Sequence, residues 1–279
     1  MAARRLSNGH THTSFCDGQN TPAEMAAGAY ALGFGALGFS GHSFCPADGF
    51  GMQDETLAAY RAEVKKLQAE YADKMLIYLG LELDSLSTPV NAADYDYIIG
   101  SVHNISTPAA RICCTDLSPE ETARAVAEFG GDGLAYAAAY FAAVDEMLNI
   151  REDLVDIVGH FDLVCKFNAD GRFFDEQNAA YKKAAAQVLQ RHARKFVFEI
   201  NTGGMSRGYL DRPYPDYWLW EIWRDAGTPV VISSDAHLAA ALDFQLSRMT
   251  EKARNFGLNV IDIADVCAAR GNIRQLFSR

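Results

Sequence analysis

Six of the seven histidines in this 279-residue chain stand at or just after short apolar segments of β-prone residues. The six are His10, His12, His42, His103, His160 and His237. His10 and His12 are two positions apart, so a strand that ends here turns both imidazoles to the same side, where they can bind one metal ion. The seventh, His192, lies in a polar segment that predicts the solvated end of a helix, and we leave it out of the site.

Three carboxylates accompany these histidines. Asp17 lies in the loop after His12, Glu82 ends an apolar run, and Asp235 follows another. A carboxylate buried at the end of such a run needs a partner, and a metal ion would supply one. Six histidines and three carboxylates are too many ligands for one ion, since a catalytic zinc takes about three protein ligands. The sequence therefore predicts two or three divalent ions, and an imidazole-rich site suits Zn, Mn or Fe better than Mg or Ca.

Taken singly, each of these residues could be an ordinary polar residue of the core or surface. Whether they form a site depends on whether the predicted strands and helices bring them together. Apolar runs predict seven strands, and helices alternate with them. The predicted strands span residues 5–9, 36–40, 75–81, 97–102, 154–158, 196–201 and 228–233. This alternation favours a parallel α/β barrel, whose chemistry lies at the C-terminal ends of the strands. Residues 105–116 are predicted to form a mobile loop over one end.

Composition narrows the class of protein. The length and the 49% hydrophobic content favour one α/β domain over residues 1–279. The net charge of −11 argues against a nucleic-acid partner, but it does not exclude a small phosphorylated substrate. We find no apolar run of membrane-spanning length and no apolar signal segment, which predicts a cytoplasmic protein without a membrane partner. The sequence leaves the oligomeric state open.

The spacing of the candidate ligands resembles that of the PHP (polymerase and histidinol phosphatase) family. The resemblance rests on an ordered set of motifs between residues 10 and 237. They are His10-Thr-His12, Ser40-Gly-His42, Gly80-Leu-Glu82, Gly100-Ser-Val-His103, Val158-Gly-His160, Glu199-Ile-Asn201 and Ser234-Asp235-Ala-His237. The resemblance implies a distorted (β/α)7 TIM-like barrel of parallel strands and a trinuclear metal centre.

Carried over by position, the resemblance implies three groups of ligands. The first ion would be held by His10, His12, Glu82 and Asp235. Glu82 would bridge to a second ion at His103 and His160, and the third would lie among Asp17, His42 and His237.

An aspartate at position 17 resembles the histidinol phosphatase branch of the family. In that branch Lys166 and Arg207 are expected to contact phosphate, and Asn201 belongs to the same motif set and is expected at the substrate. Lys166 stands where the family pattern has arginine, which bears on substrate specificity because the two side chains bind phosphate with different geometry.

We therefore expect a phosphomonoesterase that hydrolyses L-histidinol phosphate in histidine biosynthesis, with hydroxide bridging two ions as nucleophile. Glu82 and Asp235 would serve in catalysis as ligands, and the leaving alkoxide would be stabilised by the third ion or protonated by Asp17 or His237. Two alternatives remain open: a PHP phosphoesterase acting on nucleotides or oligonucleotide ends, and a non-catalytic, metal-stabilised module serving a partner protein.

Overall fold

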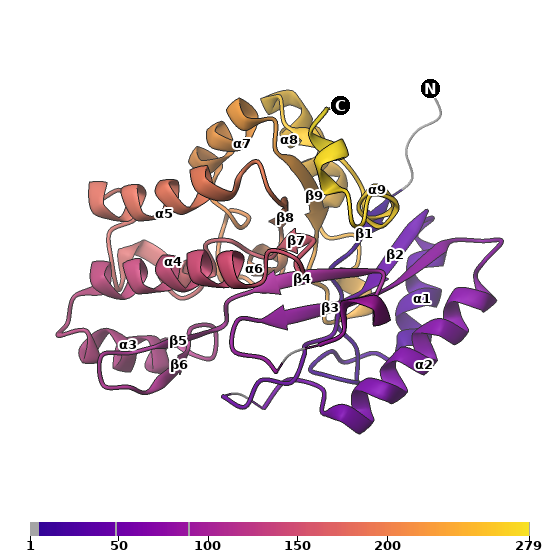
Figure 1. Cartoon of the computed structure of the whole chain (residues 1–279), viewed down its shortest axis with the longest axis horizontal. Coiled ribbons are helices and arrows are strands. Elements are labelled where there is room, and N and C mark those ends of the chain that lie inside the picture. The colour runs from indigo at the N-terminus through magenta and orange to yellow at the C-terminus, as the bar shows by residue number, and fades with distance from the viewer. Residues whose placement is uncertain (1–5, 48, 89, 279) are drawn as a thin grey trace.

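Eight parallel strands form the centre of the molecule, and helices surround them (Figure 1). The computed structural model describes residues 6–47, 49–88 and 90–278. In sheet order the strands are β1 (Ser7–Asn8), β2 (Ala36–Phe39), β3 (Leu76–Asp84), β4 (Tyr97–Ser101), β7 (Ile157–Val158), β8 (Val197–Asn201), β9 (Pro229–Ser233) and β10 (Asn259–Val260). The seven predicted strands correspond to all of these except β10. Residue 5 of the first predicted strand lies outside the described residues.

The helices alternate with the strands as the sequence predicts. They are α1 (Pro22–Ala31), α2 (Asp54–Glu70), α3 (Pro119–Glu128), α4 (Gly133–Ile150), α5 (Ala179–His192), α6 (Gly203–Ser206), α7 (Trp220–Ala226), α8 (Leu246–Phe256) and α9 (Ile263–Ala268). At the start of α1, local sequence alone explains where the helix begins. The Thr21 hydroxyl accepts a hydrogen bond from the Glu24 backbone N–H, and the Glu24 carboxylate accepts from the Thr21 N–H.

The first and last barrel strands meet just beyond their C-terminal ends. Thr11 and Ala236 form a parallel bridge, and the His12 N–H donates to the Ala236 carbonyl at 2.9 Å. Earlier along its length β9 pairs instead with β10, whose Val260 lies opposite Val230. The sheet thus forks at this edge, and the predicted (β/α)7 barrel is distorted by the added strand.

Tyr97 fills the interior beneath the site. Its hydroxyl donates to the carbonyl of Gly9 at 2.5 Å and lies 3.2 Å from that of Phe39. A Cβ atom added to Gly38 or Gly80 would collide with the Tyr97 side chain. These two glycines on β2 and β3 are therefore what allows a tyrosine inside the barrel.

Three local predictions are wrong. Residues 105–116 are not a simple loop, because β5 (Asn104–Ser106) and β6 (Ile112–Cys114) pair as an antiparallel hairpin. Strand β3 continues beyond Glu82 to Asp84, so Glu82 is inside a strand rather than at its end. His192 is fully buried instead of solvated, with its Nε2 2.7 Å from the Asp145 carboxylate. That contact lies between α4 and α5, so leaving His192 out of the site agrees with the structure.

Candidate metal centre

The strand ends bring all nine predicted metal ligands together. His10 and His12 follow β1, His42 follows β2, and Glu82 lies near the end of β3. His103 follows β4 and His160 follows β7, while Asp235 and His237 come after β9. Only Asp17 comes from a loop without an adjoining strand. The cluster is organised around the Glu82 carboxylate, which is 1% exposed.

One oxygen of Glu82 belongs to a group of four donor atoms. Glu82 Oε2 lies 3.2 Å from His10 Nε2 and 3.4 Å from His12 Nε2. Asp235 Oδ1 completes the group, 3.6 Å from His10 Nε2 and 3.2 Å from His12 Nε2. Donor atoms in a tetrahedral zinc site with bonds near 2.1 Å are separated by about 3.4 Å. His10, His12 and Glu82 are spaced to fit one metal ion, and Asp235 lies beside both histidines of this set.

The hydrogen bonding of this group supports the same conclusion. His10 Nε2, His12 Nε2 and Glu82 Oε2 are buried and make no hydrogen bond within the described parts of the chain. Buried polar atoms without partners are costly, so a group of three converging on one point calls for a ligand. Asp235 also has a positive φ of 49°, an uncommon conformation for a residue other than glycine. Such conformations persist in non-glycine residues mainly at functional sites.

The other oxygen of Glu82 faces a second group. Glu82 Oε1 lies 2.9 Å from His160 Nε2 and 3.3 Å from His103 Nε2. Glu82, His42 and His103 also form a set of ligand atoms compact enough for one ion. Because its two oxygens face different histidines, Glu82 has the geometry of a bridging carboxylate.

A third group lies nearer the surface. Asp17 Oδ2 is 3.0 Å from His237 Nε2 and 3.7 Å from His42 Nε2, and Asp17 Oδ1 is 3.4 Å from His12 Nδ1. These four residues form another set that could hold a metal ion. The three predicted ligand groups overlap with these compact sets, although no set of described residues includes Asp235 or His160, and His12 and His42 each belong to two sets.

The electrostatics of the cluster show a demand for positive charge. Burial lowers the pKa of His10, but Glu199, Glu82 and Asp235 together raise it to about 10. Burial likewise opposes protonation of His42, yet the Glu82 carboxylate raises its pKa to about 9. Burial by itself would raise the pKa of Glu82, whereas the surrounding imidazoles hold it well below its usual range. Cationic metal ions would satisfy the same carboxylates without protonating the imidazoles.

A cavity of about 280 Å³ opens beside this cluster. It is lined by Asp17, His42, Ser43, Phe50, Asp84, His103, Asp116, Leu117, Lys166 and Tyr209. Lys166 Nζ donates to the Asp116 carbonyl at 2.9 Å and lies 3.5 Å from its carboxylate. Burial raises the pKa of Asp116, but His103 and Lys166 lower it to about 2. The cavity thus presents both a cation and an anion next to the histidines.

The other two predicted substrate contacts lie outside the lining of this cavity. Arg207 Nη2 donates to Asp235 Oδ2 at 2.9 Å, and its Nη1 donates to the Asp235 carbonyl at 3.0 Å. Asn201 is fully buried: its Nδ2 donates to Glu199 Oε1, and its Oδ1 accepts from the Gly203 N–H. Its position favours a supporting role over direct contact with a substrate.

Sequence reasoning missed Asp84 and Asp116. Asp84 Oδ2 lies 3.2 Å from His103 Nδ1 and accepts from the His103 backbone N–H. Strand alternation could have identified Asp84, because it is two residues after Glu82 on the same strand and therefore on the same side. Asp116 has no such signal, because it follows the β5–β6 hairpin, a segment predicted to be a loop.

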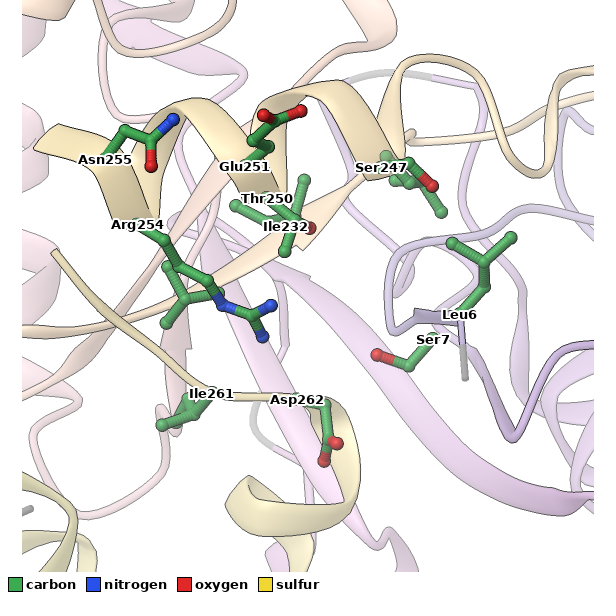
Figure 2. Close-up of a pocket in the computed structure, with 12 residues that line it drawn as sticks. Leu6, Ser7, Ile232, Ser247, Thr250, Glu251, Arg254, Asn255, Ile261 and Asp262 are labelled. Carbon is green, nitrogen blue, oxygen red and sulfur yellow. The ribbon is translucent and has the colours of Figure 1, made fainter. Parts of the chain in front are cut away.

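A second cavity, of about 330 Å³, lies at the fork between β1, β9 and β10 (Figure 2). Its wall includes Ser7, Arg254 and Asp262, and none of the predicted site residues lines it. It is separate from the histidine cluster.

No helix in the described parts of the chain is both long and apolar enough to cross a membrane.

The chain is similar in sequence to a known domain family and to named phosphatases. Residues 8–203 match the PHP domain. A probable histidinol-phosphatase of Deinococcus radiodurans is 28% identical over 90% of this chain and 94% of its own length. The histidinol-phosphatase of Lactococcus lactis is 30% identical over 82% of this chain and 83% of its own length.

A solved structure has the same fold. It is the histidinol phosphate phosphatase of Lactococcus lactis in complex with zinc, L-histidinol and phosphate. It superposes with a TM-score of 0.66 at 20% identity, covering 92% of this chain and 95% of the other. The match to the domain spans well over half of the chain, and the chain belongs to the PHP domain family.

Proposed function

We propose that this protein is a metal-dependent phosphomonoesterase that hydrolyses L-histidinol phosphate to L-histidinol and phosphate. The observation that carries the proposal is the buried donor set around Glu82, adjoining a cavity that contains Lys166. The names of the curated relatives support the substrate. Histidine biosynthesis would be its pathway and the cytoplasm its place of action.

The proposed centre holds two or three Zn, Mn or Fe ions. His10, His12, Glu82 and Asp235 would bind the first. The second would lie between Glu82, His103 and His160, and the third between Asp17, His42 and His237. Bound ions would supply Lewis acidity, which activates water at neutral pH and neutralises charge on a phosphoryl group.

The cationic side chains have the task of binding the phosphate group. Lys166 lies on the wall of the cavity and offers a point charge to a phosphate oxygen. Arg207 keeps Nη1 and Nη2 on Asp235, with Nη1 also 3.1 Å from His237 Nδ1, and it is not part of the cavity wall. We therefore assign Lys166 the larger share of phosphate binding and Arg207 the additional task of orienting Asp235.

Asp17 is the better placed of the two candidate proton donors. Its carboxylate lines the cavity and pairs with His237 Nε2 at 3.0 Å, whereas His237 is not part of the cavity wall. Burial raises the pKa of Asp17, but hydrogen bonds to His12, His237 and His42 hold it well below its usual range, so Asp17 would relay a proton from water to the leaving oxygen of the substrate rather than store one. His237 would then keep Asp17 in position.

The cavity volume and the acidic charge favour a small substrate over a nucleic acid. A volume of about 280 Å³ is at the lower end of small-molecule sites. The chain carries 36 acidic against 25 basic residues, which opposes binding along a polyanion. Asp116 provides an anion inside the cavity, and a substrate with a cationic amine would complement it.

The test is phosphate release by the purified protein supplied with Zn or Mn, comparing histidinol phosphate with nucleotides and sugar phosphates. We expect kcat/KM for histidinol phosphate to exceed that for every other substrate, and the His10→Ala variant to lose the activity. His192→Gln is the matched control outside the site and should stay active. Faster turnover of a nucleotide would overturn the substrate, and absence of any hydrolysis would favour the non-catalytic module.

A further inference from the structure

The most heavily hydrogen-bonded carboxylate near the cluster is one to which the proposed chemistry gives no task. Glu199 lies on β8, is 1% exposed, and contacts residues from three neighbouring segments. Its Oε1 accepts from the His160 backbone N–H at 2.6 Å and from Asn201 Nδ2 at 2.9 Å. Its Oε2 lies 2.9 Å from His10 Nδ1 and 2.6 Å from Ser233 Oγ, and His10 Nδ1 is also 3.2 Å from Oε1. It belongs to none of the three candidate ligand groups.

We infer that Glu199 is a positioning residue that keeps the proton of His10 on Nδ1, so that the Nε2 lone pair faces the metal position beside Glu82 and Asp235. An ionised carboxylate can only accept hydrogen bonds, so its contact with Nδ1 requires the proton to be there. A neutral imidazole then has its lone pair on Nε2, the atom 3.2 Å from Glu82 Oε2. This inference rests on the proposed metal centre, but not on the identity of the phosphoester.

The role of Glu199 extends beyond one histidine. The same Oε1 atom holds the backbone of His160, a candidate ligand on the opposite side of Glu82. One carboxylate therefore ties together the ligands after β1 and β7. Partners of this kind orient metal-binding imidazoles, and their loss typically lowers metal affinity about 10–100-fold.

Substitution by glutamine has a defined consequence because only one orientation of the amide fits. The Oε1 position faces two obligatory donors, the His160 N–H and Asn201 Nδ2, and the Asn201 amide is itself fixed because its Oδ1 accepts from the Gly203 N–H. The glutamine oxygen must therefore take the Oε1 position, and its NH2 group must face His10 Nδ1 and Ser233. The serine hydroxyl can rotate to accept. The His10 Nδ1–H then keeps only its longer contact, 3.2 Å to the oxygen at the Oε1 position, and faces an NH2 donor where it had an acceptor at 2.9 Å. The Nδ1 tautomer therefore loses much of its support, and a proton on Nε2, which blocks the metal position, becomes more favourable than in the native protein.

The experiment is a titration of purified Glu199→Gln protein with Zn²⁺ in competition with a chromophoric chelator. We expect binding at one site to weaken about 10–100-fold relative to the native protein. The matched control is Ser233→Ala, which removes one hydrogen bond from the same carboxylate but keeps its charge, and it should weaken binding less than about threefold. Equal Zn²⁺ affinity of Glu199→Gln and native protein would overturn the inference.

A second measurement needs no variant and covers the case in which Glu199→Gln fails to fold. In native protein loaded with Zn²⁺ and labelled with ¹⁵N-histidine, His10 should show a protonated Nδ1 and a metal-bound Nε2. The reverse assignment would overturn the role of Glu199. If native protein binds no Zn²⁺ at His10, the proposed centre fails; if it binds Zn²⁺ and Glu199→Gln changes nothing, only the inference fails.

Discussion

The two halves of the site differ in burial and in origin. The inner half surrounds Glu82, with His10, His12 and Asp235 each at most 5% exposed. The outer half, around Asp17 and the mouth of the cavity, is partly solvated: the Asp17 side chain is 28% exposed. Strand ends and strand residues build the inner half, whereas loops contribute much of the outer half. This difference suggests that the inner half sets metal binding and the outer half sets the choice of substrate.

Replacement of Glu82 should have the largest effect, because it touches both inner groups. Glu82→Gln removes the charge that lies between His10 Nε2 on one side and His160 Nε2 on the other. We expect bound metal to fall by at least one ion per chain and kcat to fall by more than about 10³-fold, since each ion is worth several kcal/mol to the transition state. Metal content and phosphate release measured on one preparation check this, and full metal content would contradict it.

Lys166→Ala tests the outer half. Lys166 pairs with Asp116 on the cavity wall and contacts none of the nine candidate metal ligands by hydrogen bond or ion pair among the described residues. We expect kcat/KM to fall about 100-fold while metal content stays native, because a charged hydrogen bond to phosphate is lost. Kinetics and elemental analysis separate the two halves. Loss of metal in this variant would show that they are not independent.

Arg207 lies between the two halves. A conservative change there should therefore affect both catalysis and metal binding, each less than the changes at Glu82 and Lys166. Arg207 grips Asp235 through two nitrogens, and lysine cannot reproduce this fork. Arg207→Lys should lower kcat/KM about tenfold and weaken Zn²⁺ binding by a smaller factor. Chelator competition and steady-state kinetics measure both. A change in KM alone would place Arg207 wholly in the outer half.

The smallest expected effect concerns the charge of the inner half as pH changes. In metal-free protein the pKa of His10 is raised from 6.5 to about 10 and that of His42 to about 9, by nearby carboxylates that outweigh burial. Both values exceed those of the unfolded chain, so this stabilisation is complete below pH 6.5 and is lost as pH rises through 9 to 10.

Metal ions replace these protons, so metal-loaded protein should lack this loss. We expect the Tm of metal-free protein to fall by at least about 5 °C between pH 7 and 9.5, and the Tm of metal-loaded protein to fall less. Thermal scans with chelator or with Zn²⁺ provide the comparison. Equal slopes in the two states would mean that the imidazoles are not charged without metal.

The sequence predicted the inner half better than the outer half for a physical reason. Ligands at strand ends follow from strand alternation and from the common direction of parallel strands, so the clustering of His10 with Glu82 could be expected. Lys166 meets Asp116 only because a hairpin brings the latter to the cavity, and pairing between short strands such as β5 and β6 leaves little trace in local sequence. Glu199 belongs to a motif at the end of a predicted strand, but three of its partners come from residues 10, 160 and 233, which only tertiary structure brings to it.

The most direct test of the proposed centre is anomalous X-ray scattering at the zinc edge from crystals of native protein loaded with Zn²⁺. A bridging Glu82 requires two peaks, one beside Oε2 with His10 and His12 and one beside Oε1 with His103 and His160. A further peak beside Asp17 and His237 would make the centre trinuclear. Absence of density on both sides of Glu82 would contradict a metal-dependent phosphatase built on this carboxylate.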